Sequence, residues 1–283
     1  MIRLADKDTT ANVRSSVCRW IGVTMLIPSS NEHRLETLVA AASDSQLNVR
    51  VAAVGALANY CSTPQPRRCD LELMSRTFLK SIEDHDRVSA NAVRGLGYVI
   101  CHLSKIEDTS RLLLSDLFLK LKNEIESNKR GTSATAQKCL WNTCAALSRV
   151  AEDCSSDVLK SYVTSLRSIA RRLSKICTDN ENYKVKSAAA DAISSFIRRG
   201  ENLLDMSEAR LMFALCLDIY LKEELKSGVL VSRLLSSLRT LLRNLIILKV
   251  VDDGQKSDDT RGGGSSSRRQ RIIQELLSEV KSS

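Results

Sequence analysis

The chain has 283 residues, of which 43% are hydrophobic and 4% aromatic, and its 42 Lys and Arg against 33 Asp and Glu give a formal net charge of +9. These values exclude a disordered chain and suit one large or two modest folded domains. Nine cysteines, an odd number at irregular spacings, exclude a disulfide framework and indicate a reducing compartment, the cytoplasm or the nucleus.

Neither a signal peptide nor a membrane span is expected. Met1 leads into IRLADKDTTANVR, which carries charges where an apolar stretch would begin. The most apolar run, LIILKVV with its upstream leucines, is interrupted by Arg233, Arg239 and Arg243. We therefore expect no membrane partner.

Five segments align without gaps and predict one repeated helix, which we call the B helix. They begin at Val13, Val49, Val88, Cys139 and Val185, at spacings of 36, 39, 51 and 46 residues. Positions 0, +4 and +8 from each start share one helical face, and position +4 is Val, Ala, Ala, Thr and Ala. These small residues predict that neighbouring B helices approach closely.

The residues that end and precede these helices recur as well. Pro28 and Pro64 each follow their starts by 15 residues and predict the end of a helix. An acidic turn precedes each of the first three B helices: Asp8, then Asp44, then Asp84 with Asp86.

Partner helices, which we call A helices, are predicted between the B helices. They lie at about 32–43, 70–82, 109–126 and 155–176, and a last pair begins at Ser207 and Gly228. Alternating A and B helices without strands predict an all-α fold, an α-solenoid of HEAT or armadillo helix pairs in a right-handed superhelix of about five to six units. We expect it to occupy residues 1–251.

The character of the chain changes after Val251. Residues 252–270 are polar and rich in Gly and Ser, which predicts a flexible linker. Residues 271–283 form an amphipathic segment with Ile272, Leu276 and Val280 on one face. We expect this helix to dock on the last repeat, and binding to a partner groove is the alternative.

The first B helix has hardly any A helix before it. Its apolar stripe is therefore expected to be exposed, as in a solenoid cut between two units, and a fragment, a divergent form and a truncated gene model are the alternatives.

Three stretches, RVSANAVRGLGYVI, KCLWNTCAALSRV and NYKVKSAAADAIS, resemble the C-terminal part of the HEAT repeat-containing protein 6 family. Similar phrases occur there in the same order, and the matches cover roughly residues 85–200. The resemblance implies a HEAT fold and a scaffolding role, with no catalytic residue to carry over. The chain is much shorter than members of that family.

No cluster of residues in the sequence indicates catalysis, a metal or a cofactor. Cys139 and Cys144 are five residues apart, whereas metal-binding pairs on a helix are usually three or four apart, so we interpret them as packing residues. Cys101 and His102 are the only adjacent Cys–His pair. RRLS, which ends at Ser174, fits a basophilic kinase pattern, but a serine within a helix commonly bonds back to the backbone.

The leading interpretation is a non-enzymatic scaffold whose B helices line a concave face that binds a segment of an unidentified protein partner. The predicted contact residues are Arg14, Arg50, Asn91, Arg94, Trp141, Asn142, Lys186, Arg239 and Arg243. Ladders from arginine to carboxylate between repeats are an equal alternative use of the B-helix cations. No small-molecule substrate is expected.

Two other functions are weighed. Residues 160–249 hold 16 Lys and Arg against 9 Asp and Glu, which leaves nucleic-acid binding open, although few aromatic residues are present for base stacking. A nuclear-transport-type adaptor would need a conspicuous acidic concave surface or an array of Trp and Asn, and the sequence has one Trp–Asn pair.

Overall fold

The computed structural model of the protein is helical, with no strand, over the residues that it describes. Contacts divide the chain into two compact units, residues 1–161 and residues 162–283. The described residues are 10–25, 32–63, 66–106, 111–127, 133–199, 213–214, 216–217, 220–221, 228–247, 270–271 and 273–278.

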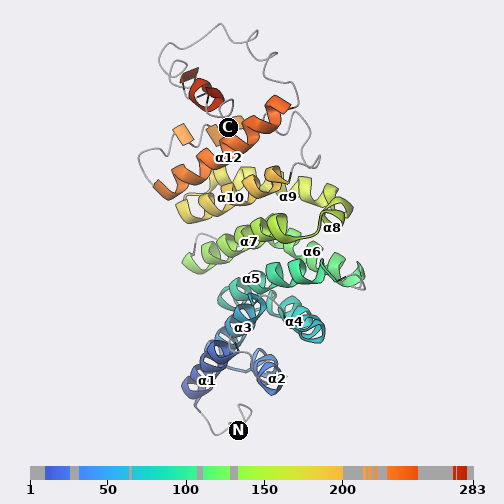
Figure 1. The fold of residues 1–283 in the computed structure, drawn as a ribbon. Helices are drawn as coiled ribbons and strands as arrows, with labels where there is room; N and C mark the ends of the chain where they lie inside the picture. The colour runs from blue at the N-terminus through green and yellow to red at the C-terminus, as the bar shows by residue number, and fades with distance from the viewer. Residues whose placement is uncertain are drawn as a thin grey trace. The chain divides into compact units, whose positions relative to one another are not determined.

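The first unit is a stack of A and B helices (Figure 1). Its B helices are α1 (Ala11–Thr24), α3 (Leu47–Cys61), α5 (Asp86–Leu103) and α7 (Ala134–Asp153). Its A helices are α2 (Glu32–Ala41), α4 (Arg68–Ser81) and α6 (Arg111–Glu126), and the short α8 (Ser156–Ser161) follows. These bounds confirm the predicted helices to within a few residues.

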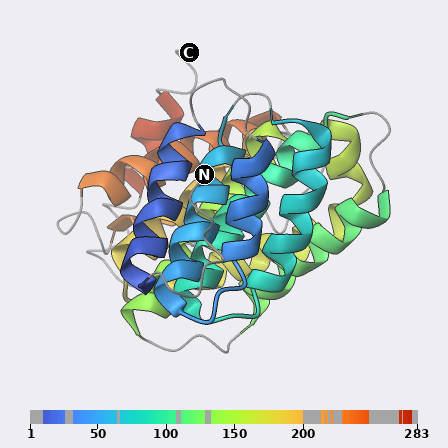
Figure 2. The same ribbon diagram turned by 90° about the horizontal axis from the view of Figure 1, so that it is seen from below.

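Successive B helices pack directly on one another, α1 on α3, α3 on α5 and α5 on α7. The A helices flank them on one side (Figure 2): α2 packs mainly on α3, and α4 packs mainly on α5. Each unit of the stack therefore contacts mainly its neighbours, which is the architecture of an α-solenoid.

Polar side chains fix where the B helices begin. Asp44 accepts a hydrogen bond from the Gln46 backbone N–H, Asp84 accepts one from the His85 N–H, and Ser133 accepts one from the Ala136 N–H. Such bonds satisfy backbone donors that have no partner at a helix start. Pro28 and Pro64 lie outside the described residues, and the helices before them end at Thr24 and Cys61.

The predicted stripe at positions 0, +4 and +8 forms the core of the stack. All of its members in α3, α5 and α7 are buried: Val49, Ala53, Leu57, Val88, Ala92, Leu96, Cys139, Thr143 and Leu147. The stripe of α1 is covered only in part, since Ile21 is buried while Val13 is exposed. On the same helix Trp20 and Val23 are exposed as well, so the expectation of an exposed apolar face on α1 is partly confirmed.

Glycine and alanine set the distance between B helices at two equivalent joints. A Cβ built on Gly22 of α1 would lie 2.7 Å from the Ala56 Cβ of α3, and one on Gly97 of α5 would lie 2.8 Å from the Ala146 Cβ of α7. Both glycines are at position +9 and both alanines at position +7 of their segments. The closest approach therefore occurs beside the predicted stripe, at small residues that the stripe does not include.

The second unit contains α9 (Val163–Asp179), α10 (Tyr183–Arg198) and α12 (Gly228–Ile247). The B helix α10 packs against both α9 and α12. The Ser237 hydroxyl of α12 donates to the Ala190 carbonyl of α10 over 3.0 Å, which joins the two helices by a buried hydrogen bond.

The prediction of one continuous helix over 155–176 is wrong. The chain leaves the helical conformation at Tyr162, where φ is −113° and ψ is 18°, so that α8 ends before it and α9 begins after it. Hydrophobic periodicity could not reveal this break, because apolar residues recur at helical spacing on both sides of it.

The C-terminal segment is helical at residues 270–271 and 273–278, where Leu276 is buried while Gln274, Glu275 and Ser278 are exposed. One face of this helix is therefore covered. The predicted linker lies outside the described residues up to residue 269. Among the described helices, none is both long and apolar enough to span a bilayer.

Candidate functional site

The cations of α1 and α3 form the ladder between repeats that the sequence left as an alternative to partner contact. Arg14 of α1 donates from Nε and Nη2 to the two Asp44 carboxylate oxygens, over 2.8 and 3.0 Å. Arg50 of α3 makes the same pair of bonds to Asp84, over 2.6 and 2.9 Å. Each arginine therefore binds the acidic turn of the following repeat in the bidentate geometry that guanidinium and carboxylate favour.

The ladder perturbs both carboxylates in the same direction. The hydrogen bond from Arg14 holds the pKa of Asp44 below its ordinary value, although partial burial opposes this effect. The hydrogen bond from Arg50 lowers the pKa of Asp84 in the same way. Both aspartates are therefore held in the charged form that the arginines need.

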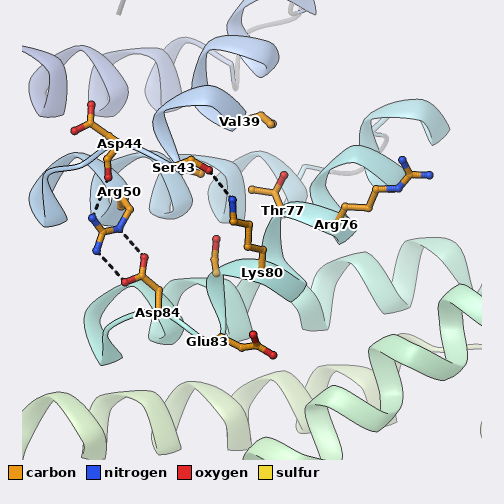
Figure 3. Close-up of a pocket in the computed structure, with 11 residues that line it drawn as sticks. Val39, Ser43, Asp44, Arg50, Arg76, Thr77, Lys80, Glu83 and Asp84 are labelled. Atoms are coloured by element: carbon orange, nitrogen blue, oxygen red, sulfur yellow. Dashed lines mark hydrogen bonds and ion pairs between the residues drawn. The ribbon is translucent and has the colours of Figure 1, made fainter. Parts of the chain in front are cut away.

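A groove of about 580 Å³ lies beside this ladder (Figure 3). Its walls carry Arg50 with Asp84, and Lys80 of α4, whose Nζ donates to Ser43 Oγ over 3.4 Å. Glu83 at its rim is bound by Lys120 of α6 over 2.8 Å. Arg50, Lys80 and Glu83 thus join neighbouring repeats at this groove, while Arg76 on its wall is exposed.

Asn91 and Asn142 form a second ladder on the same helices. The Asn91 Nδ2 of α5 donates to the Val51 carbonyl of α3 over 3.1 Å, and the Asn142 Nδ2 of α7 donates to the Ala90 carbonyl of α5 over 2.6 Å. Both asparagines are at position +3 and both carbonyls at position +2 of their segments. Two of the predicted contact residues are therefore bound to the preceding helix.

Only some of the hydrogen-bond donors of Arg94 have a partner within the structure. Its Nη2 donates to the Gly55 carbonyl over 3.2 Å and to Asn59 Oδ1 over 2.8 Å, while its buried Nε has no partner. Burial lowers the pKa of Arg94; Tyr98 opposes this shift, and the positive charge of Arg149 adds to it. A guanidinium with neutral partners and a second cation nearby is a favourable place for an anion.

Arg149 of α7 stacks on the neighbouring helix. Its Cζ lies 3.7 Å from the centroid of the Tyr98 ring of α5, and its buried Nη1 has no hydrogen-bond partner. Tyr98 follows Arg94 by one helical turn, so the two cations flank one aromatic ring. We call Arg94, Tyr98 and Arg149 the arginine cluster.

The sequence interpretation missed Tyr98, Arg149 and Asn59. All three are at position +10 of their segments, two residues beyond the aligned nonapeptides. Extending the alignment would have placed them in a row across α3, α5 and α7.

Trp141 remains exposed on α7, with 39% of its surface accessible, while its neighbour Asn142 is buried. Trp141 precedes Arg149 by eight residues, which places it about two helical turns away on the same side of α7. Trp141 and the arginine cluster together form the part of the B helices that we call the B-helix face.

The remaining predicted contact residues belong to the second unit. Lys186 is half-buried and its carbonyl accepts a bond from the Cys177 thiol, and Arg239 is exposed. Both make further interactions within the structure. The Arg243 side chain lies outside the described residues.

The candidate reactive groups are occupied in packing. Cys139 and Cys144 are fully buried, as predicted. The Cys101 thiol donates to the Arg149 carbonyl over 3.6 Å, and burial raises the pKa of this thiol, so it is not a reactive thiolate.

The Ser174 hydroxyl is buried and donates to the Ala170 carbonyl over 3.0 Å, so a kinase could reach it only after local opening of α9. No group of His, Cys, Asp and Glu among the described residues could hold a metal ion.

No protein-family model matches the chain. Its structure is similar to that of an engineered protein, with a TM-score of 0.58 and 15% identity over 84% of this chain and 94% of the other. It is also similar to a chain in a homology model of the full-length AP-3 complex, with a TM-score of 0.53 and 15% identity over 88% of this chain and 39% of that one.

A third similar chain comes from a study of the phosphorylation switch that controls the interaction between cadherin and β-catenin. The TM-score is 0.52 and the identity 19%, over 90% of this chain and 48% of that one. Identities this low show a shared fold alone. The fold is an α-solenoid of the HEAT and armadillo kind, as the repeat predicted.

Proposed function

We propose that the protein is a non-enzymatic scaffold that binds a segment of a partner protein along the B-helix face of residues 1–161. The observation that carries this proposal is that only some of the polar residues of these helices are bonded to a neighbouring repeat. Arg14, Arg50, Asn91 and Asn142 join successive repeats, whereas the arginine cluster lacks an anion and Trp141 is exposed. Similarity to chains of protein assemblies supports the class of function without naming a partner.

Site-specific cross-linking tests this proposal. Benzophenone side chains replacing Trp141 on α7 or Asn59 on α3 should capture the same partner protein, because Trp141 belongs to the B-helix face and the exposed Asn59 contacts Arg94 of that face. Leu112 of the A helix α6, which is 79% exposed, provides the matched control. Equal capture of that partner from Leu112, or capture of unrelated proteins from Trp141 and Asn59, would contradict the proposal.

We also propose a relationship to the HEAT repeat-containing protein 6 family. Its support is the order of the three resembling stretches, in which the tryptophan–asparagine pair supplies the Asn142 bond to Ala90. A solved structure of a family member would test it. If the corresponding asparagine there did not bond to the preceding B helix, the relationship would lose its structural basis.

Nucleic-acid binding is the second candidate, and the excess of cations in residues 160–249 is the observation that favours it. Several of these cations, including Arg171, Arg172 and Arg198, already have interactions within the structure. Binding to generic RNA that weakens steeply with added salt would support this candidate, and no binding at low salt would exclude it.

We do not propose a nuclear-transport-type adaptor, because Asn142 of the single Trp–Asn pair is bound to Ala90.

We propose the cytoplasm or the nucleus as the compartment, since all nine cysteines are free thiols. Fractionation of cells that produce the tagged protein would test this, and recovery from a secretory compartment would contradict it.

A further inference from the structure

The half-buried arginines of the first unit differ in how their charge is balanced. Arg14 and Arg50 are each bound by two oxygens of an aspartate. Neither Arg94 nor Arg149 forms an ion pair in the part of the chain that the structure describes. Arg94 and Arg149 therefore differ from Arg14 and Arg50, whose charges are balanced by an aspartate of the next repeat.

The two unpaired cations lie on the adjacent helices α5 and α7, which pack on each other. Arg149 stacks on Tyr98 of α5 at 3.7 Å, one helical turn from Arg94. Arg94 Nε and Arg149 Nη1 are both buried without a hydrogen-bond partner. A bound anion would balance the positive charge of the two half-buried guanidinium groups.

The surroundings favour a carboxylate over the phosphates of a nucleic acid. Residues 1–161 carry 21 Lys and Arg against 18 Asp and Glu, so this unit as a whole is nearly neutral. A polyanion would need an extended basic surface. Tyr98 is also poorly placed to stack on a base, because the Arg149 guanidinium covers its ring.

We propose that Arg94 and Arg149 together bind the carboxylate of an acidic residue in a partner protein, and that Trp141 packs on an apolar residue of the same segment. This inference rests on the proposed scaffold function and names the chemistry of its partner. Eight helical residues separate Trp141 from Arg149, a rise of about 12 Å. An extended chain covers that distance in about four residues, which sets the spacing between the apolar and the acidic residue.

Fluorescence anisotropy with the full chain tests the proposal. The probe is a short labelled peptide with two Glu residues and a Leu about four positions away. Its control peptide carries Gln in place of Glu. The Glu peptide should bind, and the Gln peptide should bind at least about tenfold more weakly, which corresponds to about 1.4 kcal/mol.

Substitutions locate the binding. R149Q and R94Q should each weaken binding of the Glu peptide by about tenfold or more, the range expected for loss of a charged hydrogen bond. R19Q is the matched control, because Arg19 is exposed on α1 at the same +6 position as Arg94. R19Q should change the affinity by less than about twofold. Thermal unfolding checks each variant, and R149Q carries the test if R94Q unfolds after losing its bonds to Gly55 and Asn59.

N59D provides a test from the opposite direction. Asn59 Oδ1 already lies 2.8 Å from Arg94 Nη2, so an aspartate there would supply an internal carboxylate to the cluster. N59D should weaken binding of the Glu peptide, whereas the neutral N59A should not weaken it to the same extent.

Several outcomes would overturn the proposal. These are equal binding of the Glu and Gln peptides, unchanged binding by R149Q, an equal effect of R19Q, or cluster-dependent binding of a phosphoserine peptide or single-stranded RNA in place of the Glu peptide. If the Glu peptide fails while cross-linking from Trp141 and Asn59 captures one partner, the acidic-segment inference falls and the scaffold function stands. If cross-linking maps the partner to α6, the scaffold site itself is wrong.

Discussion

Arg50 of one repeat and Asp84 of the next form a bidentate ion pair, and Arg14 and Asp44 form the equivalent pair one repeat earlier. Asp84 also accepts a hydrogen bond from the His85 N–H at the start of α5. One carboxylate thus binds a backbone N–H at the N-terminus of α5 and attaches this helix to the preceding repeat.

Substituting D84N separates these two roles. An asparagine oxygen can still accept the His85 N–H, but the residue cannot balance the charge of Arg50. We expect D84N to lower the urea midpoint of unfolding and to leave the helical circular dichroism of the folded state unchanged. D116N, at an exposed carboxylate of α6, is the control. Equal midpoints for D84N and the unsubstituted protein would show that the ladder does not stabilise the stack.

Acid should weaken the same ladder. Asp44 and Asp84 have lowered pKa values in the folded protein. Their contribution to the free energy of unfolding is therefore complete above the ordinary aspartate pKa of about 3.9 and is lost as the pH falls through the lower folded values. Urea midpoints measured from about pH 6 down to pH 2 should fall with pH, and less so for D84N. A D84N profile parallel to that of the unsubstituted protein would contradict this assignment.

Asn142 gives a sharper test of the second ladder. Its Nδ2 donates to the Ala90 carbonyl over 2.6 Å and is buried. N142A should reduce the free energy of unfolding by about 1 to 3 kcal/mol, since a buried carbonyl loses a partner. N142D should cost more at pH 7, because a carboxylate cannot donate and would face the carbonyl oxygen. A smaller loss for N142D than for N142A in urea titrations would rule out this bond as the reason.

The joint between α5 and α7 has no room for a methyl group at Gly97. A Cβ there would lie 2.8 Å from the Ala146 Cβ and 2.9 Å from its Cα. We expect G97A to destabilise the protein by about 1 to 3 kcal/mol, despite the higher helix propensity of alanine. In a double-mutant cycle, A146G should recover part of that loss, and additive effects of the two substitutions would argue against direct contact.

The thiols should react in two classes. Cys69 is exposed and the other eight cysteines are buried, and burial raises the pKa of Cys18 to about 11 and that of Cys216 to about 12. In the folded protein, a thiol-specific dye should label one cysteine rapidly at pH 7 and the rest only on unfolding. C69S should abolish the rapid phase. Rapid labelling of Cys139 or Cys144, detected by mass spectrometry, would contradict their role in packing.

The helices and their core stripe could be predicted because both depend on local spacing. Val49, Ala53 and Leu57 share one face of any helix that contains them, and the same spacing recurs in the other B helices. The break at Tyr162 could not be predicted, since the residues on both sides keep helical periodicity. The repeat also could not show that the closest approach falls at Gly22 and Gly97, because crowding there depends on the neighbouring helix.

For the candidate site, the sequence predicted which residue types recur, but it did not predict which partners their side chains bind. The sequence alone determined that arginines and asparagines recur at fixed positions of the B helices, because a repeat places equivalent residues on equivalent faces. Only the tertiary structure decided that Asp44 and Asp84 neutralise Arg14 and Arg50, whereas Arg94 and Arg149 form no ion pair among the described residues. That difference is made by side chains from adjacent repeats, which are about 30 to 55 residues apart in the sequence and become neighbours only when the helices stack.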